Sequence, residues 1–234
     1  MSELIQYKSE DNHVIITITN GKANAISHEV IDALNLSFDK AEKEEKPVIL
    51  TGQSGIFSAG YDLKSMTQSP ESALELVTKG SNLSHRMLSF PFPIIAACSG
   101  HAVAKGAFLL LSVDYRLGIE GDFKIGLNEV LIGMTMHNAG IEIAKARLTP
   151  VYFERSVSCS EIYNPKDAIT AGFLDKVVPQ EHLLPTAIKV ASMFSKLNKK
   201  AHKETKLKVR KPYLDSLIKA IKQDTEEGLT PPSK

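Results

Sequence analysis

Strand-like and helix-like segments alternate along most of this chain, and that alternation restricts its fold more than any other feature. Residues 13–19, HVIITIT, are rich in β-branched side chains, which predicts a strand. Residues 27–45 then show helical periodicity, and residues 47–52, PVILTG, predict a buried strand that ends at a glycine. Strands that alternate with helices favour an α/β fold over an all-α or all-β one.

The helix predicted over residues 27–45 has a start signal as well as an apolar stripe. Ser27 precedes the periodic residues, where a helix N-cap is expected. The apolar positions recur at steps of four, four and three, which places them on one helix face: Val30, Leu34, Phe38 and Ala41.

The alternation continues beyond residue 70. Residues 71–88 predict a second helix, residues 91–100 a strand bounded by prolines, and residues 114–120 a further strand. Residues 181–194 predict a helix that tolerates Pro185 in its first turn. The apolar face expected for this helix is Leu184, Ile188, Ala191 and Phe194.

Composition excludes several classes of protein. With 28 Lys and Arg against 27 Asp and Glu, the chain has no global field that would attract nucleic acid or an anionic membrane. The two cysteines, Cys98 and Cys159, have neither metal-ligand spacing nor a disulfide framework, so we expect a reducing compartment and no metal site. No apolar run is long enough to span a bilayer, and the N-terminus has no signal-peptide layout. We therefore expect a cytoplasmic protein.

The composition changes near residue 196. The segment after this point is rich in lysine, and its apolar residues are thinly spaced. One interpretation is a solvated helical pair that binds nothing. The other is a basic helical tail that contacts an anionic ligand or another subunit, and the lysine count alone does not separate the two.

Glu129 lies in an unusual apolar stretch, IGLNEVLIGM, residues 125–134. No other residue between Lys124 and His137 can carry a charge. Burying a carboxylate among apolar side chains is unfavourable unless it is paired or protonated, and such burial raises its pKa. Glu129 is therefore a candidate general base, although a Glu that caps a helix or pairs with a distant Arg would give the same local sequence.

Two further stretches contain small residues at points where the chain turns. In GIFSAGYDL, residues 55–63, Ala59 and Gly60 permit close approach of the backbone to a ligand, and the N–H of Tyr61 could point into that space. In CSGHAVAKGAF, residues 98–108, a strand passes into an apolar helix whose first N–H groups lack helical partners. Each signal alone is weak.

Taken together and in order, these stretches resemble the enoyl-CoA hydratase/isomerase (crotonase) superfamily over roughly residues 3–195. FSAGYDLKSM is similar to the first oxyanion-hole block of that family, and SGHAVAKGAFLLLSVDYRL is similar to the second. FKIGLNEVLIGM is similar to the block with a catalytic glutamate, and GKANAIS, residues 21–27, to an early segment that contacts coenzyme A. The glutamate block looks most like that of the short mitochondrial-type Δ3,Δ2-enoyl-CoA isomerases.

The resemblance implies a fold and an assembly. The fold is α/β: residues 1–195 would form a spiral of repeated β-β-α units, and residues 196–234 a C-terminal helical segment. That segment would help to assemble a homotrimer or a hexamer. The substrate would be an acyl-CoA thioester, with coenzyme A as part of the substrate and no separate cofactor.

The resemblance also implies site residues. The thioester oxygen would accept hydrogen bonds from the backbone N–H groups of Tyr61 and Lys105, and Glu129 would be catalytic. The positions that would contact the substrate or coenzyme A are Lys22, Ala23, Ala25, Ala59, Gly60, Asp62, Leu63, Gly106 and Phe108.

The acid–base residues point to a reaction. Hydratases of this superfamily use two glutamates, and Phe108 occupies the position of the first. One glutamate suffices for an isomerase, which takes a proton from C2 of a 3-enoyl-CoA and returns it at C4. The alternatives are a hydratase or another acyl-CoA reaction, and a catalytically weak acyl-CoA-binding protein.

Some positions depart from the family pattern. Lys105 stands where glycine is usual, and its side chain would reach the coenzyme A phosphates, obstruct the acyl site or face solvent. Met136 and His137 replace a Pro-Gly pair. His101 and His137 are candidate second acid–base groups, with a structural role as the alternative, and Asp62 is expected to be a turn residue rather than a catalyst.

Overall fold

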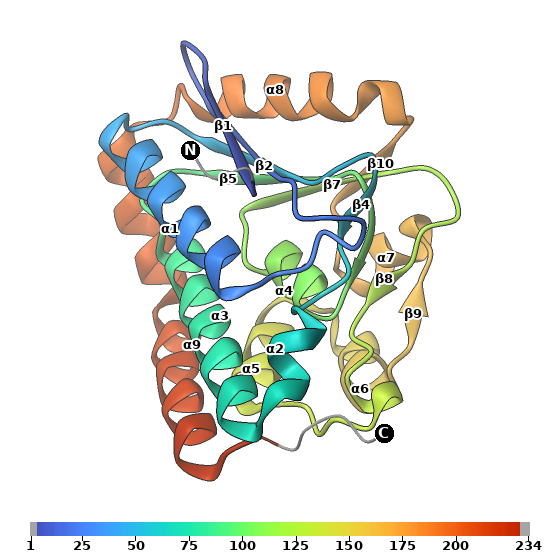
Figure 1. Cartoon of the computed structure of the whole chain (residues 1–234). Helices are drawn as coiled ribbons and strands as arrows, with labels where there is room; N and C mark the ends of the chain where they lie inside the picture. The colour runs from blue at the N-terminus through green and yellow to red at the C-terminus, as the bar shows by residue number, and fades with distance from the viewer. Residues whose placement is uncertain (1–3, 230–234) are drawn as a thin grey trace.

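The structure is a computed structural model that describes residues 4–229, in which helices surround two β-sheets (Figure 1). The six-stranded sheet has the order β1 (Ile5–Ser9), β2 (Val14–Ile18), β3 (Val48–Thr51), β5 (Ile94–Cys98), β7 (Tyr115–Ile119) and β10 (Lys176–Val178). The four-stranded sheet has the order β4 (Gly55–Ser58), β6 (Gly100–Val103), β8 (Ile125–Gly126) and β9 (Ile162–Tyr163).

The helices fall between and after these strands. The first four are α1 (His28–Lys43), α2 (Leu63–Gln68), α3 (Pro70–Ser89) and α4 (Lys105–Leu111). The remaining ones are the 3-10 turn η1 (Val130–Ile132), α5 (Asn138–Arg147), α6 (Pro150–Ser158), α7 (Pro165–Ala171), the 3-10 turn η2 (Gln180–His182), α8 (Leu183–Phe194) and α9 (Lys199–Glu227).

A unit of two strands followed by helix occurs three times in succession. β3 and β4 lead to α2 and α3, β5 and β6 lead to α4, and β7 and β8 lead through η1 to α5. In each unit the first strand joins the six-stranded sheet and the second joins the four-stranded sheet. Equivalent strands pair in parallel, β3 with β5 and β4 with β6. The expected spiral of β-β-α units is therefore confirmed.

The predicted elements over residues 13–52 agree with the structure because local signals and burial point the same way. α1 begins after Ser27, whose hydroxyl accepts a hydrogen bond from the N–H of Val30 at 3.3 Å. The predicted apolar stripe of this helix is fully buried, and β3 has three buried residues in succession. The short strands β4, β6 and β8 have no comparable apolar run.

The predicted apolar face of α8 is correct at Ala191 and wrong at Leu184, and Ile188 and Phe194 are half-buried against the six-stranded sheet. Leu184 is 40% exposed, whereas Leu183, Ala187 and Ala191 are buried. These three residues pack on the face of the six-stranded sheet that includes Ile95, and Figure 1 shows α8 lying along that sheet. Pro185 is in the first turn, as expected.

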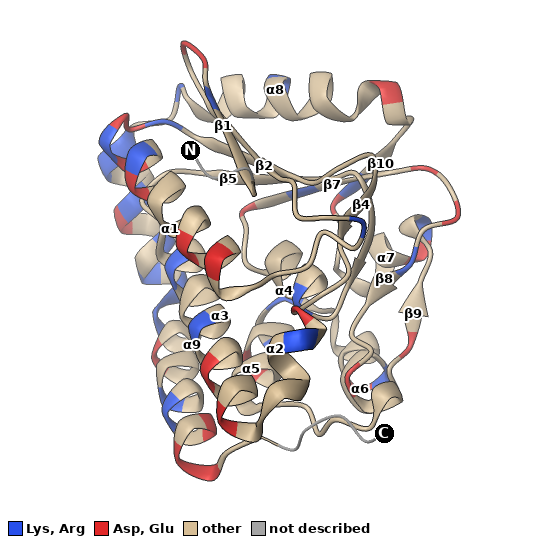
Figure 2. Cartoon of the chain, in the orientation of Figure 1, with Lys and Arg blue, Asp and Glu red and all other residues tan. Residues whose placement is uncertain are grey.

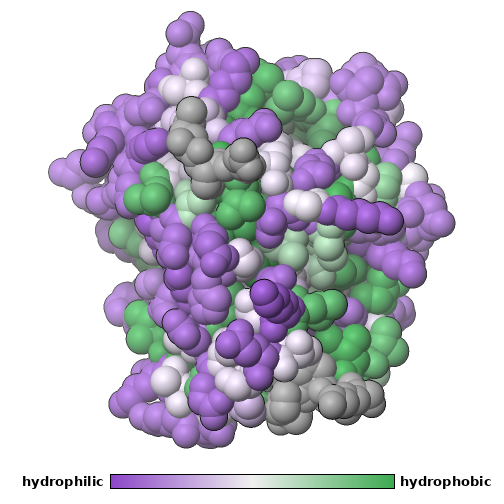
Figure 3. Space-filling view, viewed as in Figure 1, coloured by the Kyte–Doolittle hydropathy of each residue, from purple (hydrophilic) through white to green (hydrophobic). Residues whose placement is uncertain are grey.

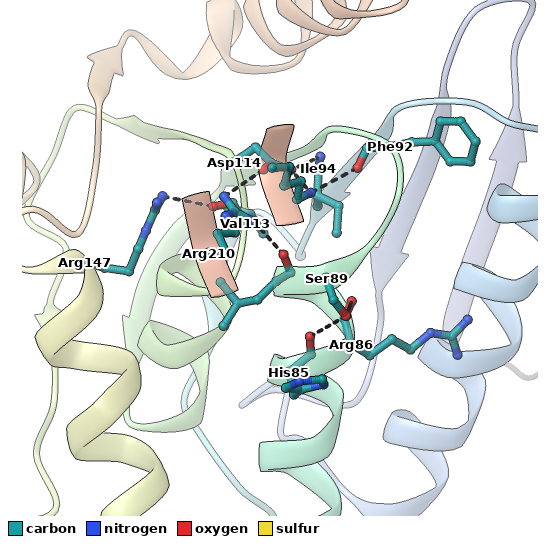
Figure 4. A network of polar contacts seen from close by, with 11 residues as sticks. His85, Arg86, Ser89, Phe92, Ile94, Val113, Asp114, Arg147 and Arg210 are labelled. Carbon is teal, nitrogen blue, oxygen red and sulfur yellow. Dashed lines mark hydrogen bonds and ion pairs between the residues drawn. The ribbon is translucent and has the colours of Figure 1, made fainter. Parts of the chain in front are cut away.

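Residues 199–227 form one long helix, α9, which corrects the interpretation of this segment as a solvated helical pair. α9 packs on α3 and α5 of its own chain, and Figure 2 shows its many basic residues. Lys206 and Arg210 are buried, and both form ion pairs at 2.8 Å with Asp114, at the start of β7. Figure 4 shows Arg210 and Asp114 in this network. Part of the lysine-rich composition thus serves to attach α9 to the core.

Within residues 4–229, no helix combines the length and the apolar character that crossing a bilayer requires.

Candidate active site

A cavity of about 420 Å³ lies where the two small-residue turns meet the Glu129 segment. Its wall comes from the loop before α1, the start of α2, α3, the turn before α4, and the segment around η1. Its lining residues are Ala23, Ala25, Ala59, Tyr61, Asp62, Leu63, Met66, Val77, Ala104, Asn128, Glu129, Ile132, Met134 and His137.

Glu129 lies in this wall, directly before η1, and is 6% exposed. One carboxylate oxygen, Oε2, is buried without a hydrogen-bond partner among the described residues. Burial raises the pKa of Glu129 to about 7, although a hydrogen bond from its own backbone N–H and, to a smaller extent, the charge of Lys105 oppose the rise. Its side chain neither caps η1 nor forms an ion pair within residues 4–229, so the capping and Arg-pairing alternatives are wrong. A carboxyl group with this pKa suits general-base catalysis near neutral pH.

The Tyr61 N–H lies between two backbone hydrogen bonds that join residues 60–62 to Ile26. Ile26 donates its N–H to the Gly60 carbonyl at 2.8 Å, and Asp62 donates to the Ile26 carbonyl at 3.1 Å. The intervening N–H of Tyr61 has no protein acceptor in the part of the chain described here. It is therefore free to donate to a ligand in the cavity that Tyr61 lines.

The Lys105 N–H is the first of α4, and the residue before it has an unusual backbone. Ala104 has φ 49° and ψ −124°, a left-handed conformation that a residue with a Cβ rarely adopts. Its own N–H donates to the Gly126 carbonyl at 3.1 Å, whereas no acceptor within residues 4–229 receives the N–H of Lys105. The strained turn thus leaves a helix-start donor unpaired beside the cavity.

The two turns are in direct contact. A Cβ added to Gly60 would lie 2.9 Å from the Cβ of Ala104 and 3.6 Å from the N of Lys105. Gly60 also has φ 109°, which glycine adopts without strain. The glycine therefore allows the segments with the two free N–H groups to approach each other.

The Lys105 side chain lies in none of the three positions considered from the sequence. It is 1% exposed and points into the protein, where its Nζ donates to the Gly80 carbonyl at 2.6 Å and to the Ser84 hydroxyl at 2.7 Å. It is not part of the cavity wall. Burial lowers the pKa of Lys105 to about 7, and the Glu129 charge opposes this change.

The structure brings together most, but not all, of the predicted contact residues. Ala23, Ala25, Ala59, Asp62 and Leu63 line the cavity with Tyr61 and Glu129. Lys22 is exposed on the preceding loop, outside this lining. Gly60, Gly106 and Phe108 are not among the lining residues.

The two predicted contact positions on α4, Gly106 and Phe108, are packing sites. A Cβ on Gly106 would lie 2.2 Å from the Ser58 carbonyl oxygen, so glycine lets α4 approach β4. The Phe108 ring is buried and meets the His137 ring edge-on at 5.5 Å.

The remaining polar candidates, Asp62, His101 and His137, differ in their hydrogen bonds and in whether they line the cavity. Asp62 caps α2, since its carboxylate accepts hydrogen bonds from the N–H and hydroxyl of Ser65, which agrees with a turn role. His101 lies outside the cavity lining, and its Nδ1 accepts from the Lys124 N–H. His137 lines the same cavity as Glu129, and burial lowers its pKa.

Several contributors gave no sequence signal. Met66, Val77, Ile132 and Met134 line the cavity, and nothing distinguishes them from ordinary core residues in the sequence. Asp224 of α9 accepts hydrogen bonds from the N–H groups of Asn138 and Ala139, so it caps α5 directly after His137. In the described part of the chain, no cluster of His, Cys, Asp and Glu could hold a metal ion.

Comparison with known proteins agrees with this geometry. The model of the enoyl-CoA hydratase/isomerase family matches residues 9–230. A solved enoyl-CoA hydratase/isomerase family protein from Pseudomonas syringae is 58% identical, with a TM-score of 0.95 over 96% of this chain and 97% of that one. An enoyl-CoA hydratase structure from Mycobacterium marinum is 34% identical, with a TM-score of 0.90 over 96% of this chain and 98% of that one.

A relative named for the other reaction is also similar. The mitochondrial enoyl-CoA delta isomerase 1 of Mus musculus is 27% identical over 228 residues, which cover 95% of this chain and 79% of that protein. Hydratase and isomerase relatives at such identities do not distinguish the two reactions. The family model, which spans nearly the whole chain, shows that the protein belongs to the enoyl-CoA hydratase/isomerase family.

Proposed function

We propose that the protein is an enoyl-CoA isomerase that moves a double bond from C3 to C2 of an acyl-CoA thioester. The observation that supports this reaction best is Glu129, which lines the cavity and has one buried carboxylate oxygen without a hydrogen-bond partner among the described residues. The other acidic lining residue, Asp62, is engaged in capping α2. Phe108, at the position of a hydratase's first glutamate, has no group that transfers protons.

The proposed mechanism uses one base and two backbone donors. Glu129 takes a proton from C2 of the 3-enoyl thioester, and the electron pair of the C–H bond delocalises onto the thioester oxygen. The N–H groups of Tyr61 and Lys105 donate hydrogen bonds to that oxygen as its negative charge develops. The protonated Glu129 then returns the proton at C4, which leaves the double bond between C2 and C3. Coenzyme A takes part only as a portion of the substrate.

The second candidate reaction is hydration of a 2-enoyl-CoA. His137 favours it, because this side chain lines the same cavity and its lowered pKa keeps the imidazole neutral near pH 7, as a hydrogen-bonding partner for a water. A hydratase would then use Glu129 and His137 together. A weak acyl-CoA-binding protein is the third candidate.

One assay separates the three candidates. The protein is supplied in parallel with a 3-enoyl-CoA and a 2-enoyl-CoA, and the products are identified. We expect isomerisation of the first substrate, and addition of water to the second at least ~100-fold more slowly, since a water would lack its second acid–base group. Hydration as fast as isomerisation would reject the proposal in favour of a hydratase. Binding of both thioesters without turnover would identify a binding protein.

We also propose that the protein assembles as a homotrimer or a pair of trimers, in the cytoplasm. Large apolar side chains are exposed on η1 and α6, with Leu131 at 73% and Val151 at 72%. Figure 3 shows hydrophobic surface at the lower right, where α6 lies in Figure 1. On α9, Val209 and Ile218 are exposed as well and are available to pack between subunits. Sedimentation measures the assembly, and a stable monomer at micromolar concentration would contradict it.

A further inference from the structure

The two residues that present the free N–H groups also direct their side chains to one place. The Tyr61 hydroxyl donates to the Val77 carbonyl at 3.4 Å, and the Lys105 Nζ donates to the Gly80 carbonyl and the Ser84 hydroxyl. All three acceptors lie within two turns of α3. We refer to the side chains of Tyr61 and Lys105 on this part of α3 as the α3 clamp.

The parts of the clamp fit each other closely. The Lys105 Nζ lies 5.8 Å from the centroid of the Tyr61 ring, within reach of a cation–π contact. A Cβ added to Gly80 would lie 2.1 Å from the Tyr61 hydroxyl oxygen, so only glycine leaves room for the ring against α3. Neither donor segment can shift relative to α3 without breaking these contacts.

The Lys105 ammonium group has no ion-pair partner within residues 4–229, since its two hydrogen-bond acceptors are neutral. The other charged groups of α3 do not compensate it. Lys79 and Arg86 pair with Asp32 and Asp39 of α1, and the acidic Glu71 and Glu75 are exposed.

The charge that acts favourably on Lys105 is that of Glu129. Glu129 raises the pKa of Lys105, and Lys105 lowers the pKa of Glu129, so each charge stabilises the other. Two more titratable groups complete the surroundings. Lys105 lowers the pKa of His137, and Asp224 raises it.

We propose that Lys105 is a positioning residue whose side chain, together with Tyr61, fixes both N–H donors on α3 and whose ammonium charge stabilises the ionised form of Glu129. The inference rests on the proposed isomerase function. The geometry explains why a buried lysine occupies a position that needs only a backbone N–H. Its side chain connects the two halves of the donor pair and supplies a positive charge behind them.

The test compares three variants. Lys105→Met keeps the length of the side chain and the backbone N–H but removes the charge and both hydrogen bonds. Ser84→Ala removes one acceptor and keeps the charge. Lys79→Met is the matched control. Lys79 is next to Gly80 on α3 but pairs with Asp32 of α1, so this variant removes a nearby lysine charge without changing the contacts of Lys105.

Two measurements are made on each variant. The first is kcat and KM for a 3-enoyl-CoA over a range of pH. The second is the pKa of the Glu129 carboxyl in the substrate-free protein, followed by NMR of ¹³C-labelled glutamate, with Glu129→Gln to assign the signal.

For Lys105→Met we expect kcat to fall about 100-fold with KM changed less than about threefold, since the effect is on the transition state. The Glu129 pKa should rise by about one unit, because an opposite charge has been removed. Ser84→Ala should lower kcat less than about tenfold without moving the Glu129 pKa, and Lys79→Met should leave both unchanged. Should Lys105→Met fail to fold, Lys105→Gln replaces it with the same expectations.

The inference is overturned if Lys105→Met retains kcat within about threefold, or if its Glu129 pKa equals that of the parent. It is also overturned if Lys79→Met reproduces the effects, since any nearby lysine would then suffice. Failure of the parent protein to isomerise would instead reject the proposed function. The NMR titration needs no substrate, so it still decides whether the Lys105 charge acts on Glu129.

Discussion

Two regions of this molecule bury charged side chains, and they treat the charges in opposite ways. Asp114, whose side chain is 13% exposed, pairs with the buried Lys206 and Arg210 of α9 and also accepts a hydrogen bond from the Ile94 N–H (Figure 4). Although burial opposes it, the pairing with these two cations holds the pKa of Asp114 below its usual value. Glu129, in contrast, has a buried oxygen without a partner in the described chain, and its pKa is raised to about 7.

The difference shows how the same kind of residue serves two purposes. A buried charge with full compensation stays ionised and attaches one element to another, as Asp114 attaches α9 to the start of β7. A buried charge without direct compensation gains or loses a proton near neutral pH, which is what proton transfer requires. The first arrangement should therefore govern stability and the second activity.

The largest expected effect concerns the uncompensated region. Glu129→Gln keeps the shape of the side chain and removes the base, so we expect isomerisation to fall at least ~1000-fold, a loss of about 4 kcal/mol in the transition state. Affinity for the thioester should stay nearly constant, because the change affects the chemical step. Steady-state kinetics and thioester binding measure the two quantities. Turnover within about threefold of the parent would show that Glu129 is not the base.

The second prediction tests the compensated region. Asp114→Asn leaves Lys206 and Arg210 buried without their anion, and we expect the free energy of unfolding to fall by about 3–5 kcal/mol. Denaturant unfolding measures the loss, and the kcat of the folded fraction should be close to that of the parent.

Asp215→Asn supplies the control for this prediction. Asp215 pairs with Lys211 on the exposed side of the same helix, so we expect a change below about 0.5 kcal/mol. Equal losses from both substitutions would mean that burial is not what gives the Asp114 cluster its effect.

The smallest expected effect is on the pH dependence of folding stability, to which Glu129 and Asp114 contribute with opposite signs. The folded-state pKa of Glu129, about 7, exceeds the ordinary value of 4.5, so the folded protein binds the extra proton. Its contribution to stability is therefore full below about pH 4.5 and is lost as the pH rises through 7. The lowered pKa of Asp114 acts in reverse, since its contribution is present above its ordinary pKa and is lost as the pH falls through the folded-state value.

Comparison of Glu129→Gln with the parent isolates the contribution of Glu129 to the pH dependence of stability. As the pH rises from 5 to 8, the unfolding free energy of the variant should increase by about 1–3 kcal/mol relative to that of the parent. Unfolding in denaturant at each pH gives the difference in unfolding free energy between the variant and the parent. If Glu129 were paired as Asp114 is, this difference would stay constant over the same pH range.

The sequence predicted the elements whose local signals agree with their burial. The Ser27 cap and the four-residue stripe of α1 are examples, because one face of a helix repeats often enough to be recognised. β8 has only two residues and β6 only four, too few for a period, so the second sheet was expected only through the family resemblance. On α8 only the Leu184 position was wrong, because Leu183 and Leu184 are adjacent apolar residues and the pattern does not choose between them.

For the site, the sequence identified Glu129 by its apolar surroundings but not the place of the Lys105 side chain. That side chain is held by Gly80 and Ser84, which lie 25 and 21 positions away, and neither forms a recognisable motif with it. Asp224 is farther still in sequence from the residues that it caps. Such contacts follow from how the helices pack, which local spacing does not encode.

The backbone of Ala104 has a consequence for protein engineering. Its left-handed conformation stores roughly 1–3 kcal/mol, which makes replacement by glycine an obvious choice in any campaign to raise thermostability. Glycine would also give the turn more freedom, and the donor at Lys105 follows directly after it. A search that selects only for heat resistance would therefore choose this position early and obtain a sturdier protein with slower turnover.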